Sequence, residues 1–386
     1  MSFRDFISTS KQQRLEAGLL RELRTVESPQ GVIVKRGGRE LVNFCSNDYL
    51  GLANSDELKQ VAQEAIKNWG VGAGASHLVC GHQTPHYQLE LELAEFSNAE
   101  KAIVFSTGYM ANLAVPSAFL TRHDLLLQDK LNHASLIDAG LLSRSATKRY
   151  RHLDVDHAGE LMRDADQPNI LLATDGVFSM DGTIADAKAL QELCDSENRL
   201  LLVDDAHGFG VLGDEGRGTL EQAGVKPTGQ TLMIGTLSKA IGGFGAFAAG
   251  DALFIDHLIQ HARPYIYTTA LPPSIAQANR KGLQLLRAQP WRRERLRENI
   301  ATFRRLAEEN DVPLMVSQTP IQSVVFEDPV QAVLASAQLE EDGLLVVAIR
   351  PPTVPEGTSR LRITISAAHE MAQIQQLVKS LSSTPT

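Results

Sequence analysis

The sequence of 386 residues has little of what marks several protein classes. It has three cysteines, Cys45, Cys80 and Cys194, which are too few for a disulfide framework and, being odd in number, cannot all pair. No apolar run approaches the ~18 residues that a membrane-spanning helix needs. There is no basic block either, since 37 Lys+Arg stand against 46 Asp+Glu and the net charge is −9. These absences exclude the disulfide-scaffold and membrane classes, and they disfavour a nucleic-acid or anionic-membrane partner.

The amino-terminal stretch MSFRDFISTSKQQRLEAGLL is charged throughout and lacks the apolar core of a secretory signal peptide. Together with the odd cysteine count, this predicts a soluble protein of a reducing compartment, the cytoplasm. The composition, 43% hydrophobic and 22% charged, is ordinary for a globular protein. The length predicts about two or three structural units.

From about residue 55 to 290, helical stretches alternate with short apolar runs. The runs are AIVF (102–105), LLLQ (125–128), ILLATDG (170–176), LLLVDD (200–205), TLMIGT (231–236) and GAFAAG (245–250). Such runs between helices are typical of strands buried on both faces of a parallel sheet. We therefore expect a large, doubly wound α/β domain over 55–290.

The flanking segments have a different pattern. In 1–54, a charge-rich amphipathic helix over about the first 25 residues precedes GVIVKRGGRELVNFCS, which predicts a hairpin around a Gly37-Gly38 turn. In 291–386, a basic helix leads into QSVVFE, a helix, LLVVAI, RLRITIS and a last helix near 369–383. RLRITIS alternates polar and apolar residues, which predicts a strand with one solvent-exposed face. We expect 291–386 to form a smaller α+β domain.

Polar residues gather at the ends of the predicted buried strands. They are Asp175 with Ser179; Asp204, Asp205 and His207; Thr236, Ser238 and Lys239; and Ser106, Thr107 and Gly108 at a predicted helix start. Ligands of open α/β sheets bind beyond the carboxyl ends of the strands. Each residue alone has an ordinary explanation as a cap, a turn residue or a surface charge. Their joint occurrence at successive strand ends points to a ligand site.

Bound pyridoxal phosphate uses this set of groups. A lysine forms a Schiff base with its aldehyde, a carboxylate holds the pyridine nitrogen protonated, and a helix start binds the phosphate. Asp204 and Lys239 are 239 − 204 = 35 residues apart, which leaves room for one further strand between them. Both side chains are therefore expected at the same sheet edge.

The sequence resembles the α-oxoamine synthases, a family of fold type I pyridoxal-phosphate enzymes. The matching stretches are NFCSNDYLGL (43–52), NHASLIDAG (132–140), TDGVFSMDGTIA (174–185), DDAHGFGVLGDEGRG (204–218), GTLSKAIGG (235–243), YIYTTALPP (265–273) and IRPPTVPEGTSRLRITISAAH (349–369). They cover nearly the whole chain in family order. The resemblance implies a fold type I PLP-dependent transferase, with a mostly parallel, doubly wound sheet in a large domain and a smaller α+β C-terminal domain.

The resemblance also implies roles for single residues. Lys239 matches the Schiff-base lysine, which also removes the Cα proton of the bound amino acid. Asp204 matches the partner of the pyridinium nitrogen, and His207 the hydrogen-bond donor to the phenolic oxygen of the ring. His133 matches the residue stacked on the ring and is a candidate to polarise a thioester carbonyl. The remaining cofactor and phosphate contacts match Gly108, Tyr109, Ser179 and Thr236.

Substrate contacts are implied at four further positions. Arg350, in I-R-P-P, matches the arginine that binds the substrate carboxylate, for which its planar fork is suited. Thr353, Asn47 and Arg21 fall where the family contacts substrate. Arg21 lies in a weak motif and is equally well explained as a surface charge on a helix.

Within the family, the sequence is most similar to the members that act in biotin biosynthesis. The implied reaction is a decarboxylating acyl transfer from pimeloyl-CoA, or from a pimeloyl carrier protein, to L-alanine, with release of CO2 and free thiol. The resemblance further implies a homodimer, with the neighbouring subunit contributing Thr268 or Thr269.

Two alternative functions stay open at this point. One is a sister α-oxoamine synthase, such as glycine C-acetyltransferase or 5-aminolevulinate synthase. The other is a PLP-binding regulator joined to a DNA-binding module, which the negative net charge disfavours.

Two further motifs have weaker support. Cys80, His82 and His86 lack the second ligand pair of a metal site, so we expect no metal. Gly70, Gly72 and Gly74 follow a helix rather than a strand, so they do not fit a dinucleotide-binding loop. The family often has arginine at the position of His77, and the role of this residue stays open.

Overall fold

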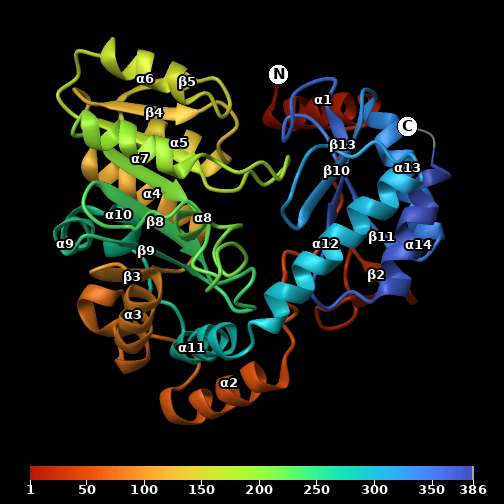
Figure 1. Cartoon of the computed structure of the whole chain (residues 1–386), viewed down its shortest axis with the longest axis horizontal. Helices are drawn as coiled ribbons and strands as arrows, with labels where there is room; N and C mark the ends of the chain where they lie inside the picture. Colours follow the sequence, from red (N-terminus) through yellow and green to blue (C-terminus); the bar gives the residue numbers. More distant parts are fainter. Residues whose placement is uncertain (385–386) are drawn as a thin grey trace. The chain divides into compact units, whose positions relative to one another are not determined.

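The computed structural model of the chain describes residues 1–384 (Figure 1). It divides into two compact units. The larger unit contains residues 50–179 and 183–294, and the smaller contains residues 1–49, 180–182 and the described chain from residue 295. The predicted boundaries, 54/55 and 290/291, lie within five residues of these, and the segments that flank the larger unit fold together into one smaller unit. The assignment of these units as domains stays a prediction.

The larger unit is built on a seven-stranded sheet with the order β3-β9-β8-β7-β6-β4-β5 (Figure 1). The strands are β3 (Lys101–Phe105), β4 (Leu125–Asp129), β5 (Ala146–Tyr150), β6 (Ile170–Asp175), β7 (Leu200–Asp204), β8 (Thr231–Thr236) and β9 (Ala246–Gly250). All neighbours pair in parallel except β9, which is antiparallel to both β3 and β8. The mostly parallel sheet is thus confirmed. The sequence analysis missed β5, whose residues ATKRY are mostly polar and lie at the sheet edge.

Helices cover both faces of this sheet. The helices of the larger unit are α2 (Asp56–Trp69), the π-helix η1 (His77–Gly81), α3 (Thr84–Ser97), α4 (Gly108–Phe119), α5 (Ala134–Ser143), α6 (Val155–Arg163), α7 (Ala187–Ser196), α8 (Thr219–Gln222), α9 (Ala252–His261), α10 (Arg263–Ile266) and α11 (Pro273–Ala288). Side chains of β7 alternate between the two faces: Leu202 packs in a core with α4, α5 and α9, whereas Leu201 and Val203 point to the opposite face. Both sets are fully buried, which explains the continuous apolar runs of the sequence.

The smaller unit contains two three-stranded sheets, β1-β2-β11 and β10-β13-β12. Their strands are β1 (Ile33–Arg36), β2 (Arg39–Asn43), β10 (Ile321–Phe326), β11 (Leu344–Leu345), β12 (Val347–Ile349) and β13 (Ser359–Thr364). The remaining helices of the chain are α1 (Phe3–Glu16), α12 (Trp291–Glu309), α13 (Pro329–Glu341) and α14 (Met371–Ser382). The hairpin predicted around Gly37 and Gly38 is confirmed, and both glycines have the positive φ that its turn requires, +58° and +75°.

Two predictions for this unit were wrong. Helix α1 ends at Glu16 rather than near residue 25, and no residue of Phe3–Glu16 is buried. Strand β13 has no solvent-exposed face, because it is the central strand of its sheet and all six residues are buried. Its arginines are buried with partners: Arg360 binds the Asp181 carboxylate at 2.5 Å, and Arg362 donates to the Thr364 hydroxyl at 3.1 Å.

Within residues 1–384, no helix has both the length and the apolar character needed to cross a membrane.

Candidate active site

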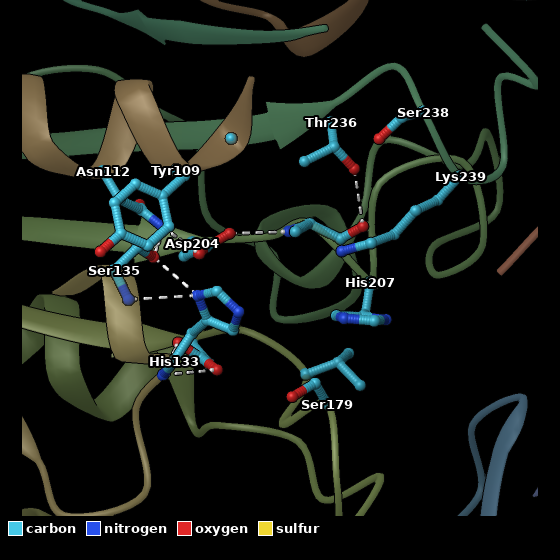
Figure 2. Close-up of a pocket in the computed structure, with 14 residues that line it drawn as sticks. Tyr109, Asn112, His133, Ser135, Ser179, Asp204, His207, Thr236, Ser238 and Lys239 are labelled. Carbon is cyan, nitrogen blue, oxygen red and sulfur yellow. Dashed lines mark hydrogen bonds between the residues drawn. The ribbon is translucent and has the colours of Figure 1, made fainter. Parts of the chain in front are cut away.

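The carboxyl ends of β6, β7 and β8 and the N-terminal ends of α4 and α5 surround a cavity of about 170 Å³ (Figure 2). It is lined by Gly108, Tyr109, Asn112, His133, Ser135, Asp175, Val177, Ser179, Asp204, Ala206, His207, Thr236, Ser238 and Lys239. All eight cofactor-contact residues that the sequence analysis named are among them. The cavity lies entirely within the larger unit.

Asp204 is the last residue of β7 and is only 5% exposed. One carboxylate oxygen accepts a hydrogen bond from Asn112 Nδ2 at 2.5 Å, and the other accepts the Ala206 N–H at 3.0 Å. Because an ionised carboxylate only accepts, these two donors fix the orientation of a charged acceptor beside the cavity.

Two other buried carboxyl groups flank Asp204. Asp175 pairs with it in register between β6 and β7, and burial followed by the charge of Asp204 raises the pKa of Asp175 well above its usual range. Asp205 binds the backbone N–H and the hydroxyl of Thr219, at 2.7 and 2.5 Å. Burial raises the pKa of Asp205 to about 7. At Gly218, where φ is +101°, an added Cβ would collide with the Asp205 carboxylate, so this acid holds the glycine-rich loop that follows β7.

The start of α4 also lines the cavity. Thr107 caps the helix by accepting the Met110 N–H at 3.2 Å, and Gly108 is its first residue. A Cβ added at Gly108 would lie 3.0 Å from Thr236 Cγ2, so the backbone passes close to Thr236. The first-turn N–H groups of a helix attract anions. With the nearby Thr236 hydroxyl, this part of the cavity is suited to a phosphate group.

Lys239 follows β8 by three residues and is half-buried. Its side chain extends into the cavity between Thr236 and His207 (Figure 2). The charge of Lys239 lowers the pKa of Asp175 and so opposes the effect of burial. An amine so placed can act both as nucleophile and as base.

His133 caps α5, and its backbone N–H donates to the two oxygens of Asp175 at 3.1 and 3.2 Å. Its Nδ1 lies 2.7 Å from the Ser135 hydroxyl, which in turn lies 2.8 Å from Asn112 Nδ2. The sequence analysis missed Asn112 and Ser135 as site residues. The signal available for Asn112 was a polar residue within the apolar stretch MANLAVP of a helix.

Three of the four predicted substrate residues lie together in the smaller unit. Arg21, Arg350 and Thr353 line a groove of about 710 Å³, and Arg21 Nη2 lies 3.5 Å from the Thr353 hydroxyl. Arg350 donates to the Gly18 carbonyl oxygen. Burial, followed by the charges of Arg21 and Arg24, lowers the pKa of the Arg350 guanidinium. A groove with several cationic groups is suited to an anionic ligand.

Asn47 lies outside the described residues that line this groove. Its side-chain oxygen accepts from Arg362 Nη2 at 3.2 Å and from the Tyr49 hydroxyl at 3.3 Å. Thr268 and Thr269 lie outside the described lining of the strand-end cavity, and their contribution to the site of a second subunit stays a prediction.

The histidines of the GVGAGASHLVCGHQTPH stretch lie together, with His77 Nδ1 3.0 Å from His82 Nδ1. His86 instead binds the Leu271 carbonyl oxygen and the Gln83 N–H. Among residues 1–384, no group of three or more His, Cys, Asp or Glu side chains could hold a metal ion.

Comparisons with known proteins agree with this site. The family model for class I and II aminotransferases matches residues 39–381. The 8-amino-7-oxononanoate synthase of Hahella chejuensis is 49% identical over 95% of this chain and 93% of that protein. The corresponding synthase of Ectopseudomonas mendocina is 51% identical over 96% and 95%.

Solved structures show the same fold. A serine palmitoyltransferase from S. paucimobilis, with a bound PLP–myriocin adduct, superposes with a TM-score of 0.92 at 29% identity, covering 98% of this chain and 96% of that one. The 8-amino-7-oxononanoate synthase of Francisella tularensis gives a TM-score of 0.76 at 33% identity, covering 89% and 97%. The chain belongs to the class I and II aminotransferase family and, within it, to the 8-amino-7-oxononanoate synthases.

Proposed function

We propose that this chain condenses L-alanine with a pimeloyl thioester, either pimeloyl-CoA or a pimeloyl carrier protein. The products are 8-amino-7-oxononanoate, CO2 and free thiol, and the reaction is a step of biotin biosynthesis. The observation that carries the proposal is the meeting of Lys239, Asp204 and the start of α4 around one cavity. Relatives about 50% identical over nearly the whole chain favour this function over the sister synthases and over a regulator.

The residues of the cavity fit pyridoxal 5′-phosphate. Asp204 offers a fixed carboxylate, the start of α4 offers first-turn N–H groups, and the Lys239 side chain extends into the same cavity. When bound, this cofactor supplies an electron sink for the carbanion formed at Cα of the amino acid. We assign the remaining cofactor and phosphate contacts to Gly108, Tyr109, Ser179 and Thr236.

Lys239 supplies the amine that binds the cofactor aldehyde and then serves as the base that takes the proton from Cα of L-alanine. Asp204 holds a proton on the pyridine nitrogen, because its charge favours the protonated ring. His207 donates a hydrogen bond to the phenolic oxygen. His133 stacks on the ring and donates to the thioester oxygen, where negative charge develops as the acyl group transfers.

In the smaller unit, we assign Arg350 to the alanine carboxylate, which its planar guanidinium can bind through two oxygens. Arg21 and Thr353 line the same groove and are assigned to substrate with it. Asn47 is assigned to substrate through the side-chain amide that Arg362 orients. The homodimer, the contribution of Thr268 or Thr269 and the cytoplasmic location remain predictions from the sequence.

Thiol release from pimeloyl-CoA by the cofactor-loaded protein tests the proposal. We expect release with L-alanine and much less with glycine, and a product with the mass of 8-amino-7-oxononanoate. Lys239→Ala is the matched control for thioester hydrolysis that does not depend on the site. Release that requires glycine with acetyl-CoA or succinyl-CoA would instead assign the chain to a sister synthase.

A further inference from the structure

A chain of hydrogen bonds joins two groups of the cavity that act on different parts of the reaction. His133 Nδ1 contacts the Ser135 hydroxyl at 2.7 Å, the hydroxyl contacts Asn112 Nδ2 at 2.8 Å, and Asn112 Nδ2 contacts Asp204 at 2.5 Å (Figure 2). Asn112 and Ser135 are 2% and 0% exposed, so water does not compete for these bonds. The four residues come from α4, the start of α5 and the end of β7.

The orientation of the Asn112 amide follows from its partners. Asp204 accepts at both oxygens, so the Asn112 atom beside it must be the NH2 group rather than the carbonyl oxygen. One N–H of this group donates to Asp204 and the other donates to the Ser135 oxygen. The Asn112 carbonyl oxygen is buried without a hydrogen-bond partner among the described residues, which indicates that the donors alone hold this side chain in place.

The contacts of Ser135 also determine which ring nitrogen of His133 carries the proton. A hydroxyl can accept two hydrogen bonds as well as donate one, so the bond from Asn112 leaves the direction of the Ser135–His133 bond open, and the backbone decides it. The Ser135 backbone N–H points at His133 Nδ1, at 3.3 Å. Two donors therefore converge on Nδ1, which must carry a lone pair. The proton of the neutral ring is then on Nε2.

We propose that Asn112 and Ser135 are positioning residues that orient His133 and the Asp204 carboxylate within this site. Ser135 holds His133 in the tautomer with the proton on Nε2, and Asn112 orients both the Ser135 hydroxyl and the Asp204 carboxylate. His133 then presents an N–H to the thioester oxygen, which a ring protonated on Nδ1 could not do. This inference rests on the proposed function for the role of the Nε2 proton, whereas the tautomer itself is a property of the protein.

The tautomer is measured directly by 15N NMR of the holoenzyme labelled with [15N]histidine, with His133→Gln used to identify the His133 signals by difference. We expect an unprotonated Nδ1 and a protonated Nε2 in the wild type. In Ser135→Ala we expect a mixture of both tautomers, because the hydroxyl donor at 2.7 Å is lost and only the longer backbone N–H contact at 3.3 Å remains on Nδ1. Ser143→Ala is the matched control: it removes a buried hydroxyl from the same helix that donates instead to the Gly140 carbonyl. A protonated Nδ1 in the wild type, or an unchanged tautomer in Ser135→Ala, would overturn the proposal.

Asn112→Leu tests the role of Asn112 separately from the effect of Ser135 on the His133 tautomer. It keeps the approximate volume of the side chain but removes both donors, so we expect the dissociation constant of the cofactor to rise roughly 3- to 10-fold. The Nε2 proton should remain in this variant, since Ser135 can still donate to Nδ1. Equal cofactor affinity in wild type and Asn112→Leu would contradict the role given to Asn112.

Thiol release is recorded in parallel for each variant. We expect kcat to fall roughly 3- to 10-fold in Ser135→Ala, with the KM for L-alanine little changed. If the wild type releases no thiol from pimeloyl-CoA or from a pimeloyl carrier protein, the proposed function fails, but the NMR result still decides the tautomer. If the tautomers change as expected but the enzyme uses other substrates, the positioning roles of Asn112 and Ser135 still hold.

Discussion

The two units of the chain bury polar side chains in different places. In the seven-stranded sheet, polar residues lie at the ends of strands, as with Asp175 and Asp204 at the last positions of β6 and β7. In the β10-β13-β12 sheet they lie along the strands, where Arg360 binds Asp181 and Gln322 binds the Thr319 carbonyl oxygen. The carboxyl ends of β6 and β7 face a cavity, whereas Arg360 and Gln322 are bonded to other parts of the protein.

The difference separates two uses of buried polarity. The strand-end groups hold donors and acceptors toward a ligand, and their local partners orient them. The groups within β13 are bonded to the protein itself and stabilise the smaller unit. We therefore expect changes at strand ends to reduce activity with little loss of stability, and changes within β13 to do the reverse.

The largest effect is expected for Lys239→Ala. Loss of the nucleophile and base should lower thiol release by roughly 10⁴-fold or more, with the melting temperature of the apoprotein almost unchanged. Borohydride reduction followed by peptide mass spectrometry should add the cofactor mass to the Lys239 peptide in the wild type only. A cofactor adduct on a different lysine would show that the strand-end site has been assigned to the wrong residue.

The next effect is on stability, at the Arg360–Asp181 pair. Arg360→Met leaves the buried Asp181 carboxylate without its cation, so the unfolding free energy should fall by about 3–5 kcal/mol. Hydrogen exchange of the β13 amides measures this loss. Arg305→Met is the control, because it breaks an exposed pair with Glu309 and should cost about 1 kcal/mol or less. Equal losses in the two variants would remove the distinction between buried and surface ion pairs.

Arg350→Ala tests whether the smaller unit contributes to substrate binding as well as to stability. Without this guanidinium, the KM for L-alanine should rise about 10- to 100-fold, because charge-assisted hydrogen bonds to the carboxylate are lost. Steady-state kinetics with varied L-alanine measure it. Arg24 lines the same groove and pairs with Glu340, and Arg24→Ala should change the KM by less than about threefold. A rise in KM confined to the acyl donor would assign Arg350 to that substrate instead.

The smallest effect expected is a pH dependence with opposite signs in the two units. His369 is buried against Phe44, and burial lowers its pKa to about 4. The unfolded chain binds a proton below about pH 6.5 that the folded smaller unit excludes, so stability is lost as the pH falls through this range. Between pH 6.5 and 5, the wild type should lose about 2 kcal/mol relative to His369→Asn.

The Asp205 carboxyl has the opposite sign, since burial raises its pKa to about 7. Below that pH the folded larger unit retains a proton that the unfolded chain releases until about pH 4, so its stability rises as the pH falls from 7 toward 4. Hydrogen exchange at β7 and β13, corrected for the intrinsic pH dependence, resolves the two units. Parallel changes in both strands would show that these groups do not control the pH response.

Much of the larger unit could be predicted from the sequence, because its strands are buried on both faces and read as continuous apolar runs. Strand β5 was missed since ATKRY, at the edge of the sheet, has no such run. In the smaller unit, the alternation of polar and apolar residues in RLRITIS predicts a strand with one solvent-exposed face, which the structure does not have. Local sequence could not reveal that Asp181, about 180 residues away, provides a buried partner for Arg360.

The site shows the same limit. Lys239, Asp204 and Thr107 could be located because they follow apolar runs or precede a helix. Asn112 and Ser135 could not, since their roles depend on the packing of α4 against α5 rather than on any local pattern. Sequence identified the groups that contact a ligand, and the structure was needed to find those that orient them.

The parallel pairing of β2 with β11 has a consequence for synthesis of the chain. Val42 pairs with Leu344, so the hairpin emerges from the ribosome about 300 residues before its partner strand. At roughly 5–20 residues per second, this leaves the open edge of β2 without its neighbour for about 15–60 s. During that time the larger unit is completed and can fold. The hairpin edge is therefore a segment of the nascent chain that needs protection from pairing with other chains.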